Sequence, residues 1–131
     1  MNNYTKIEPK DFMAYDCFPK PKSDDFKSIL KYTEARKYTG ISFENVEVVL
    51  GFLIEDEYSR EYFVEKAFLY SDQYGSKYDT FMREIEEFLL FDPVFLCDII
   101  GLKGTAQVEV EEVGRELKFK IIKFTPNGYD K

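Results

Sequence analysis

Alternating apolar and polar residues mark the C-terminal third of the chain most clearly. Residues 106–113 and 116–124 each alternate, and Gly114 and Arg115 separate them. A two-residue connection that begins with glycine is typical of a type II′ turn, so the pattern predicts a β-hairpin. Starting from Val113 opposite Glu116, apolar residues face each other on one side and opposite charges on the other. The predicted pairs are Val110–Phe119, Val108–Ile121, Glu111–Lys118 and Glu109–Lys120.

The N-terminal half predicts three further strands, one of them ambiguous. Residues 43–54 carry apolar side chains on both faces, and residues 62–70 follow a polar connection, so the two segments predict a hairpin. Residues 26–38 contain the Ile, Tyr and Thr that favour strands. Helical spacing of their apolar residues, with Ser23 as a cap and Gly40 as a stop, supports a helix instead. We favour the strand and keep the helix as the alternative.

One amphipathic helix is predicted between the third and fourth strands. Ser76 is a candidate N-cap, with Asp79 three residues later as a variant of the capping box. The apolar stripe that follows consists of Phe81, Ile85, Phe88 and Leu89. Asp92 and Pro93 then predict the start of a short second helix, which ends at Gly101.

This order of elements predicts a mostly β protein of the α+β class. Three strands, a helix and two strands are the arrangement of an OB-like five-stranded barrel with its helix between strands 3 and 4. Residues 23–131 form the single OB-like domain of this prediction. Residues 1–22, punctuated by Pro9, Pro19 and Pro21, are predicted to be an extended N-terminal arm.

Composition argues for a binding protein rather than an enzyme. The 131 residues include 13 Phe and 10 Tyr but no His, and the formal net charge is -7. Histidine is the commonest general base and metal ligand, and the chain has no glycine-rich phosphate loop or nucleophile motif. The acidic runs suit a solvated surface. We therefore expect no catalytic residues, no metal and no cofactor.

The two cysteines and the absence of a long apolar run favour the cytoplasm. Cys97 lies in an apolar run and is predicted to be a small core residue, and Cys17 lies in a proline-containing segment that suits exposure. The sequence leaves a disulfide between them open. No signal peptide or apolar run of about 18 residues is present, so no membrane contact is expected.

Aromatic and basic residues are interleaved where an OB-like barrel would bind a ligand. Rings stack on bases and cations follow phosphates in proteins that bind single strands. The predicted nucleic-acid-binding residues are Arg36, Lys37, Tyr38, Tyr62, Lys66, Tyr70 and Arg115. The alternative is that Tyr62 and Tyr70 only pack and that Lys66 is only solvated. Lys118 and Lys120 face acids in the predicted hairpin, which argues against a role in phosphate binding.

Several short motifs extend this hypothesis through a resemblance. They are Gly75-Ser76-Lys77-Tyr78 before the helix, Asp98-Ile99-Ile100-Gly101 leading into a strand, Val108-Glu109-Val110-Glu111, Gly114, and Ile121, Phe124 and Pro126 near the end. Over residues 26–126 the pattern resembles small single-stranded-DNA-binding proteins of phages and mobile elements. The resemblance implies an OB-like barrel that acts in DNA replication or recombination. Two features depart from it: residues 127–131 do not supply the acidic tail common in such proteins, and the net charge is negative.

The net charge also supports a second function. An acidic interaction module, such as a phage-encoded inhibitor or a nucleic-acid mimic that binds a host protein, would carry such carboxylate clusters. The expected partners are thus single-stranded DNA or, alternatively, a host or phage protein. The sequence leaves homo-oligomerisation open.

Overall fold

The computed structural model describes residues 3–10, 20–39, 44–90 and 94–129. Residues 3–10 are exposed and belong to no helix or strand, and the division at residue 22 stays a prediction. The elements are β1 (Asp25–Thr39), β2 (Glu44–Glu55), β3 (Glu61–Leu69), α1 (Lys77–Leu89), a short 3-10 helix η1 (Leu96–Ile99), β4 (Leu102–Val113) and β5 (Glu116–Tyr129).

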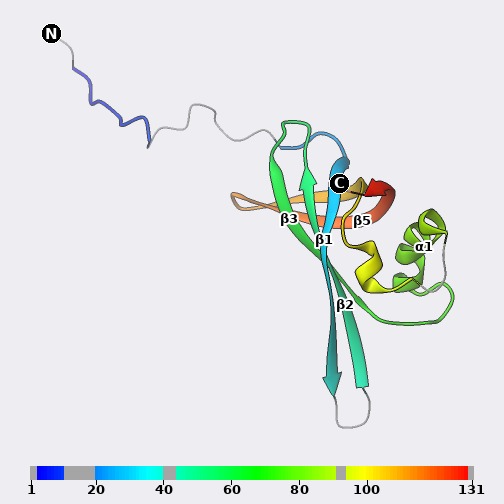
Figure 1. The fold of residues 1–131 in the computed structure, drawn as a ribbon. Coiled ribbons are helices and arrows are strands. Elements are labelled where there is room, and N and C mark those ends of the chain that lie inside the picture. Colours follow the sequence, from blue (N-terminus) through cyan, green and yellow to red (C-terminus); the bar gives the residue numbers. More distant parts are fainter. Residues whose placement is uncertain (1–2, 11–19, 40–43, 91–93, 130–131) are drawn as a thin grey trace.

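The five strands form one antiparallel sheet in the order β3-β2-β1-β4-β5 (Figure 1). The prediction of a mostly β fold with a helix between the third and fourth strands is confirmed. Residues 26–38 lie inside β1, so the helix alternative for this segment is wrong. Within the described part of the chain β3 and β5 are the two edges of the sheet, and no backbone ladder joins them. Closure into a barrel is therefore not observed.

The C-terminal hairpin has the predicted register. Val113 pairs with Glu116 across a turn in which Gly114 adopts a φ of +65°, as a glycine-first hairpin turn requires. The four predicted cross-strand pairs are all present. Beyond them the register shifts between Gln107 and Val108, and the strands continue to Leu102 and Tyr129. Alternation alone does not reveal this shift.

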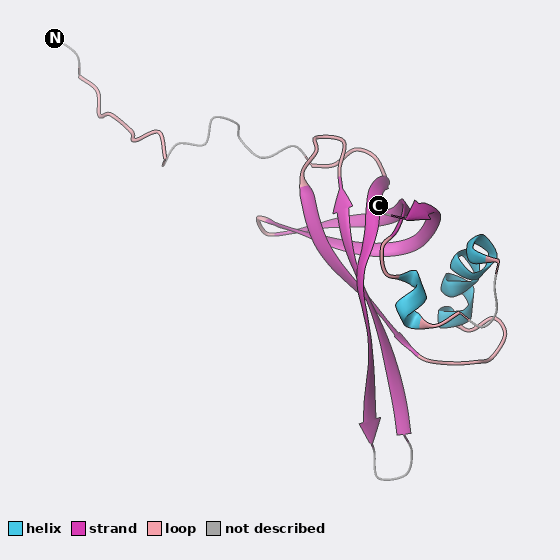
Figure 2. Cartoon of the chain, viewed as in Figure 1, coloured by secondary structure: helices cyan, strands magenta, loops and turns pink. Residues whose placement is uncertain are grey.

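The hydrophobic core lies between one face of the sheet, here called the inner face, and α1 (Figure 2). Aromatic rings dominate it: the ring centroids of Phe52 and Phe124 are 5.1 Å apart, and those of Phe68 and Phe81 are 4.9 Å apart. The predicted helix stripe is confirmed for Phe81 and Ile85, whereas Phe88 is exposed. Packing of this kind fixes α1 against β3 and β5.

α1 begins where the sequence predicts. The Ser76 hydroxyl accepts a hydrogen bond from the Asp79 N–H at 3.0 Å, which satisfies one of the unpaired donors of the first turn. The Asp79 carboxylate accepts from the Gly75 N–H at 2.8 Å instead of from Ser76, and it also contacts Arg83. The helix ends at Leu89, and the residue after it, Leu90, caps the helix with a left-handed φ of 58°.

The short second helix requires two corrections. Asp92 and Pro93, its predicted start, lie outside the described residues, and η1 begins later, at Leu96. Cys97 is exposed rather than buried. A 3-10 helix has three residues per turn, so two residues two positions apart point in different directions. Because Ile99 is fully buried, the side chain of Cys97 points away from the core. Cys17 also lies outside the described residues.

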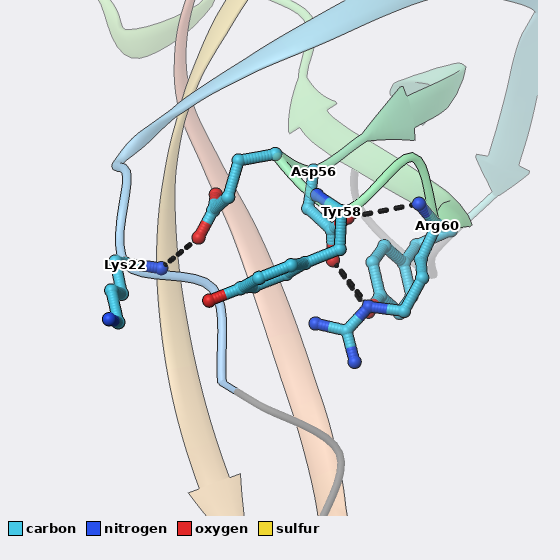
Figure 3. Close-up of polar contacts among 6 residues, drawn as sticks. Lys22, Asp56, Tyr58 and Arg60 are labelled. Carbon is cyan, nitrogen blue, oxygen red and sulfur yellow. Dashed lines mark hydrogen bonds and ion pairs between the residues drawn. The ribbon is translucent and has the colours of Figure 1, made fainter.

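One buried carboxylate organises the turn between β2 and β3 (Figure 3). Asp56 accepts hydrogen bonds from the backbone N–H groups of Tyr58 and Arg60, both at 2.9 Å. Its second oxygen accepts from the Arg60 Nε at 2.8 Å and from the Tyr62 hydroxyl at 3.0 Å. Burial raises the pKa of Asp56, but these hydrogen bonds outweigh it and leave the pKa below its usual value. The predicted β2–β3 hairpin is thus confirmed, with Tyr62 fixed at the start of β3.

Candidate functional site

β3 presents two chemically different faces. Its side chains alternate, so Tyr62, Val64, Lys66 and Phe68 point to the inner face, and the residues between them point outward. The predicted grouping of Tyr62 and Lys66 on one face is therefore confirmed. Because β3 is an edge strand, this inner face meets β5 across a gap without backbone pairing, which we call the seam.

Aromatic side chains close the seam at one end. The ring centroids of Tyr62 on β3 and Phe119 on β5 are 4.3 Å apart, and the Tyr62 hydroxyl is held by Asp56. Burial and the hydrogen bond to Asp56 raise the pKa of Tyr62. The contact therefore holds the start of β3 against β5.

Further along, the seam widens into a groove of about 470 Å³, the seam groove. Its walls come from β3, β4, β5 and the first half of α1, so residues that are distant in sequence line the same groove. Its lining residues are Lys66, Phe68, Gly75, Lys77, Thr80, Phe81, Glu84, Gln107, Ile122 and Lys123.

Lysines dominate the charge of the seam groove. Burial lowers the pKa of Lys66, and the positive charges of Lys120 and Lys77 lower it further, against a smaller opposing effect of Glu109. The Lys66 Nζ lies 5.3 Å from the centroid of the Phe68 ring. A lysine whose ammonium is partly desolvated next to other ammonium groups favours a bound anion.

Few carboxylates neutralise these lysines. Lys123 forms an ion pair with Glu84 at 3.1 Å. Within the described ranges, no ion pair joins Lys66, Lys77 or Lys120 to an acid. Lys120 does pair with Glu109 in the β4–β5 ladder, but the pairing is one of backbone register and does not become an ion pair. Contrary to the expectation from the sequence, Glu109 therefore does not neutralise Lys120 through an ion pair.

Tyrosines surround the helix end of the seam groove. Tyr70 directly follows β3, is 50% exposed, and contacts Tyr78 with ring centroids 5.2 Å apart. Tyr74 is 87% exposed, and the Arg83 guanidinium carbon lies 4.4 Å from its ring centroid. Exposed rings beside a basic groove are able to stack on planar ligands.

The other predicted site residues lie elsewhere. Arg36, Lys37 and Tyr38 belong to β1. Arg36 lies level with the last residue of β3, and from Lys37 onward β1 and β2 continue beyond β3 as a two-stranded ribbon (Figure 1). Arg36 pairs with Glu47, which places it on the outer face, opposite to Lys66. Arg115 is exposed in the β4–β5 turn, as predicted. The predicted single groove that joins all seven residues is therefore not formed.

Arg36 is also engaged by acids of its own face. Its guanidinium lies 2.9 Å from a carboxylate oxygen of Glu34 and 3.5 Å from one of Glu47. The hydrogen bond from Arg36 to Glu34 raises the pKa of Arg36 above its usual value. The Tyr38 hydroxyl also contacts Glu47, at 3.4 Å. These contacts reduce the attraction of the ribbon for phosphate.

Three lysines beside the seam groove are absent from the predicted site. The sequence pattern marks Lys77 only as part of the helix start and Lys120 only as the partner of an acid. Lys123 reaches the groove because alternation breaks in β5, where Ile122 and Lys123 are both exposed between buried Ile121 and Phe124. That break is visible in the sequence as a pair of adjacent isoleucines, which is a signal that could have identified Lys123.

Comparison with known proteins gives no family for the chain. No protein-family model matches it, and no curated protein matches it significantly. In the described part of the chain, no three acidic or cysteine side chains gather in a way that would hold a metal ion. No helix among those residues combines the length and apolar character needed to cross a bilayer.

Proposed function

We propose that the protein binds single-stranded nucleic acid in the seam groove. The observation that carries the proposal is the presence of Lys66 and Lys77 in the lining of the groove, with Lys120 near enough to Lys66 for its charge to lower the pKa of Lys66. Within the described residues, none of the three lysines forms an ion pair with a carboxylate, although the chain as a whole is acidic. Partly desolvated lysines that lie close together attract a negative charge most strongly. A phosphodiester supplies that charge.

The arrangement of strands supports an OB-like architecture for this site. β1 pairs with both β2 and β4, and β5 pairs with β4, so one more pairing, between β3 and β5, would close the sheet into a barrel. The seam lies where that pairing would form. We propose that the fold is an OB-like barrel open at this point and that the nucleic-acid strand passes along the opening.

Exposed rings would supply the second half of the interaction. Tyr70 and Tyr74 lie beside the lysines, and stacking on a base contributes roughly 1–3 kcal/mol. Such contacts accept every base, so the proposal predicts little sequence preference. The net charge of -7 opposes binding at long range, so we expect a modest affinity. Contacts between the lysines and phosphates release counterions, so this affinity should fall as the salt concentration rises. The resemblance to phage single-strand-binding proteins supports the same function, in replication or recombination, without catalysis.

Fluorescence anisotropy with labelled oligo-dT tests the proposal. The oligonucleotide should exceed the roughly 4–16 nucleotides that an OB fold covers, and titrations at about 50 and 200 mM salt give the salt dependence. The test variant replaces Lys66, Lys77 and Lys120 by Gln. The matched control replaces three lysines away from the groove, Lys27, Lys31 and Lys103, and so has the same net charge.

The two variants must differ if the seam groove is the site. Three lost phosphate contacts reduce the slope of log K against log salt by about 2, because each contributes roughly 0.7 on a single strand. The control keeps most of the slope, since its lysines do not line the groove. Equal losses of slope in both variants would mean that net charge, and not the seam groove, determines binding. An absence of binding by the unmodified protein at low salt would refute the proposed function.

A further inference from the structure

The outer face of β1, β2 and β3 is the second prominent surface of the protein. The strand registers place its side chains in rows that cross the three strands. One row is apolar throughout and consists of Ile29, Leu53 and Phe63. The row on one side of it consists of Lys27, Glu55 and Glu61. The row on the other side consists of Tyr32, Gly51 and Glu65.

An aromatic pair is built into this surface. The rings of Tyr32 and Phe63 are stacked, with centroids 5.6 Å apart and planes 19° apart. The Tyr32 ring crosses β2 directly above Gly51, where a Cβ atom would lie 2.2 Å from the ring. Glycine at this position therefore allows a tyrosine of β1 to reach a phenylalanine of β3. Phe63 nevertheless remains 55% exposed.

Carboxylates surround the apolar row on its β2 and β3 side. Glu61 and Glu65 flank Phe63 on the same face of β3, and Glu55 is its diagonal neighbour on β2. Glu47 lies opposite exposed Leu69. Within the described residues, β3 carries no cation on this face. Its charge thus opposes that of the seam groove, although the two surfaces share one strand.

A groove of about 580 Å³ runs across this surface. It begins at Glu55 and Glu61, whose two carboxylates outnumber the one ammonium of Lys27 beside them, passes over Ile29 and Leu53, and reaches Lys103 on β4. A floor of apolar side chains with charged ends suits an extended peptide, whose apolar side chain enters the floor while its charges meet those at the ends. A phosphate backbone does not suit the acidic end.

We infer that this outer face, from Ile29 across Leu53 to Phe63, is a docking surface for an extended segment of another protein that carries lysine or arginine beside an apolar side chain. The basic residue faces the carboxylates of β2 and β3, and the apolar side chain covers Phe63 and Leu53. Two copies of this chain would bring their acidic faces together, so a different, basic partner is favoured. The surface lies opposite the seam groove and leaves that groove free.

Selection from a displayed library of random peptides against the full chain tests the inference. We expect enrichment of peptides that combine Lys or Arg with an apolar or aromatic residue. A synthetic peptide of the enriched sequence should lose at least tenfold in affinity when Glu61→Lys and Glu65→Lys are combined, and also with Phe63→Ser. Phe63→Leu, which keeps an apolar surface, should retain most of the affinity.

Two controls separate the effect of this surface from the effects of net charge and of the seam groove. Glu112→Lys with Glu116→Lys makes the same change in net charge at the exposed β4–β5 turn and should leave peptide affinity unchanged. Oligo-dT binding should survive Glu61→Lys with Glu65→Lys, so failure of the docking surface and failure of the seam groove are distinguishable. No enrichment, enrichment of acidic peptides, equal losses in both charge variants, or self-association that Phe63→Ser abolishes would each overturn the inference.

Discussion

Replacement of Asp56 tests how the seam is held together. The Asp56 side chain is fully buried and accepts four hydrogen bonds, two from backbone N–H groups and two from the side chains of Arg60 and Tyr62. Asp56→Ala leaves these donors without their acceptor. Because hydrogen bonds to a charged group contribute about 1.5–3 kcal/mol and some donors regain water, we expect a total loss of about 3 kcal/mol.

Asp56→Asn separates the two oxygens. An amide keeps one carbonyl oxygen for the N–H groups of Tyr58 and Arg60, but it turns an NH₂ group toward the Arg60 guanidinium. We therefore expect a smaller loss, about 1–2 kcal/mol. Urea unfolding followed by far-UV circular dichroism measures both variants. Asp56→Gly is less suitable as a comparison, because glycine also changes the flexibility of the unfolded chain.

The difference between the unmodified protein and Asp56→Asn should depend on pH. The folded-state pKa of Asp56 lies below its unfolded value, so ionised Asp56 stabilises the fold above the unfolded pKa of roughly 4. This contribution disappears as the pH falls through the folded-state pKa. The stability difference is thus constant at neutral pH and shrinks in acid. A loss below about 1 kcal/mol for Asp56→Ala, or a difference that grows in acid, would refute the assigned role of this carboxylate.

Three further changes test other parts of the structure. Ser76→Ala removes the cap of α1 and should reduce the free energy of unfolding by about 1 kcal/mol in urea titrations. Gly104→Ala places a Cβ 2.1 Å from the carbonyl oxygen of Thr125 and should cost about 1–3 kcal/mol, with loss of amide protection in β4 and β5. Lys120→Gln should raise the pKa of Lys66 only part of the way to the usual value of a lysine, because burial is the larger cause of the lowered pKa. NMR titration of the Lys66 side chain measures this change.

Local pattern is sufficient to predict the hairpin and the helix start. In the hairpin of β4 and β5, apolar pairing on one face and charge pairing on the other demand the same register, and a slip by one residue would break both. At α1, the cap needs only Ser76 and the backbone of Asp79. Both features depend on residues close in sequence, so the sequence alone predicts them.

The seam groove could not be predicted in the same way. β3, α1 and β5 are far apart in the chain, and Lys66, Lys77 and Lys123 meet only after the sheet curls. Register shifts after Leu30 and Gln107 also change which side chains share a face. Such shifts depend on packing between strands. Arg36 is grouped with Lys66 in the predicted site because both would lie beside the ligand-binding face of an OB-like barrel, although the two lie on opposite faces of the sheet.

Charge segregation on β3 reconciles the net charge of -7 with the proposed binding of an anion in the seam groove. The strand alternates Lys66 on its inner face with Glu61 and Glu65 on its outer face, so strand geometry separates the two signs by the thickness of one sheet. At physiological salt, charges more than about 8 Å apart are largely screened in solvent. A phosphate in the proposed site would therefore respond mainly to the nearby lysines, and the carboxylates of the outer face would act mainly on the protein partner proposed for that face.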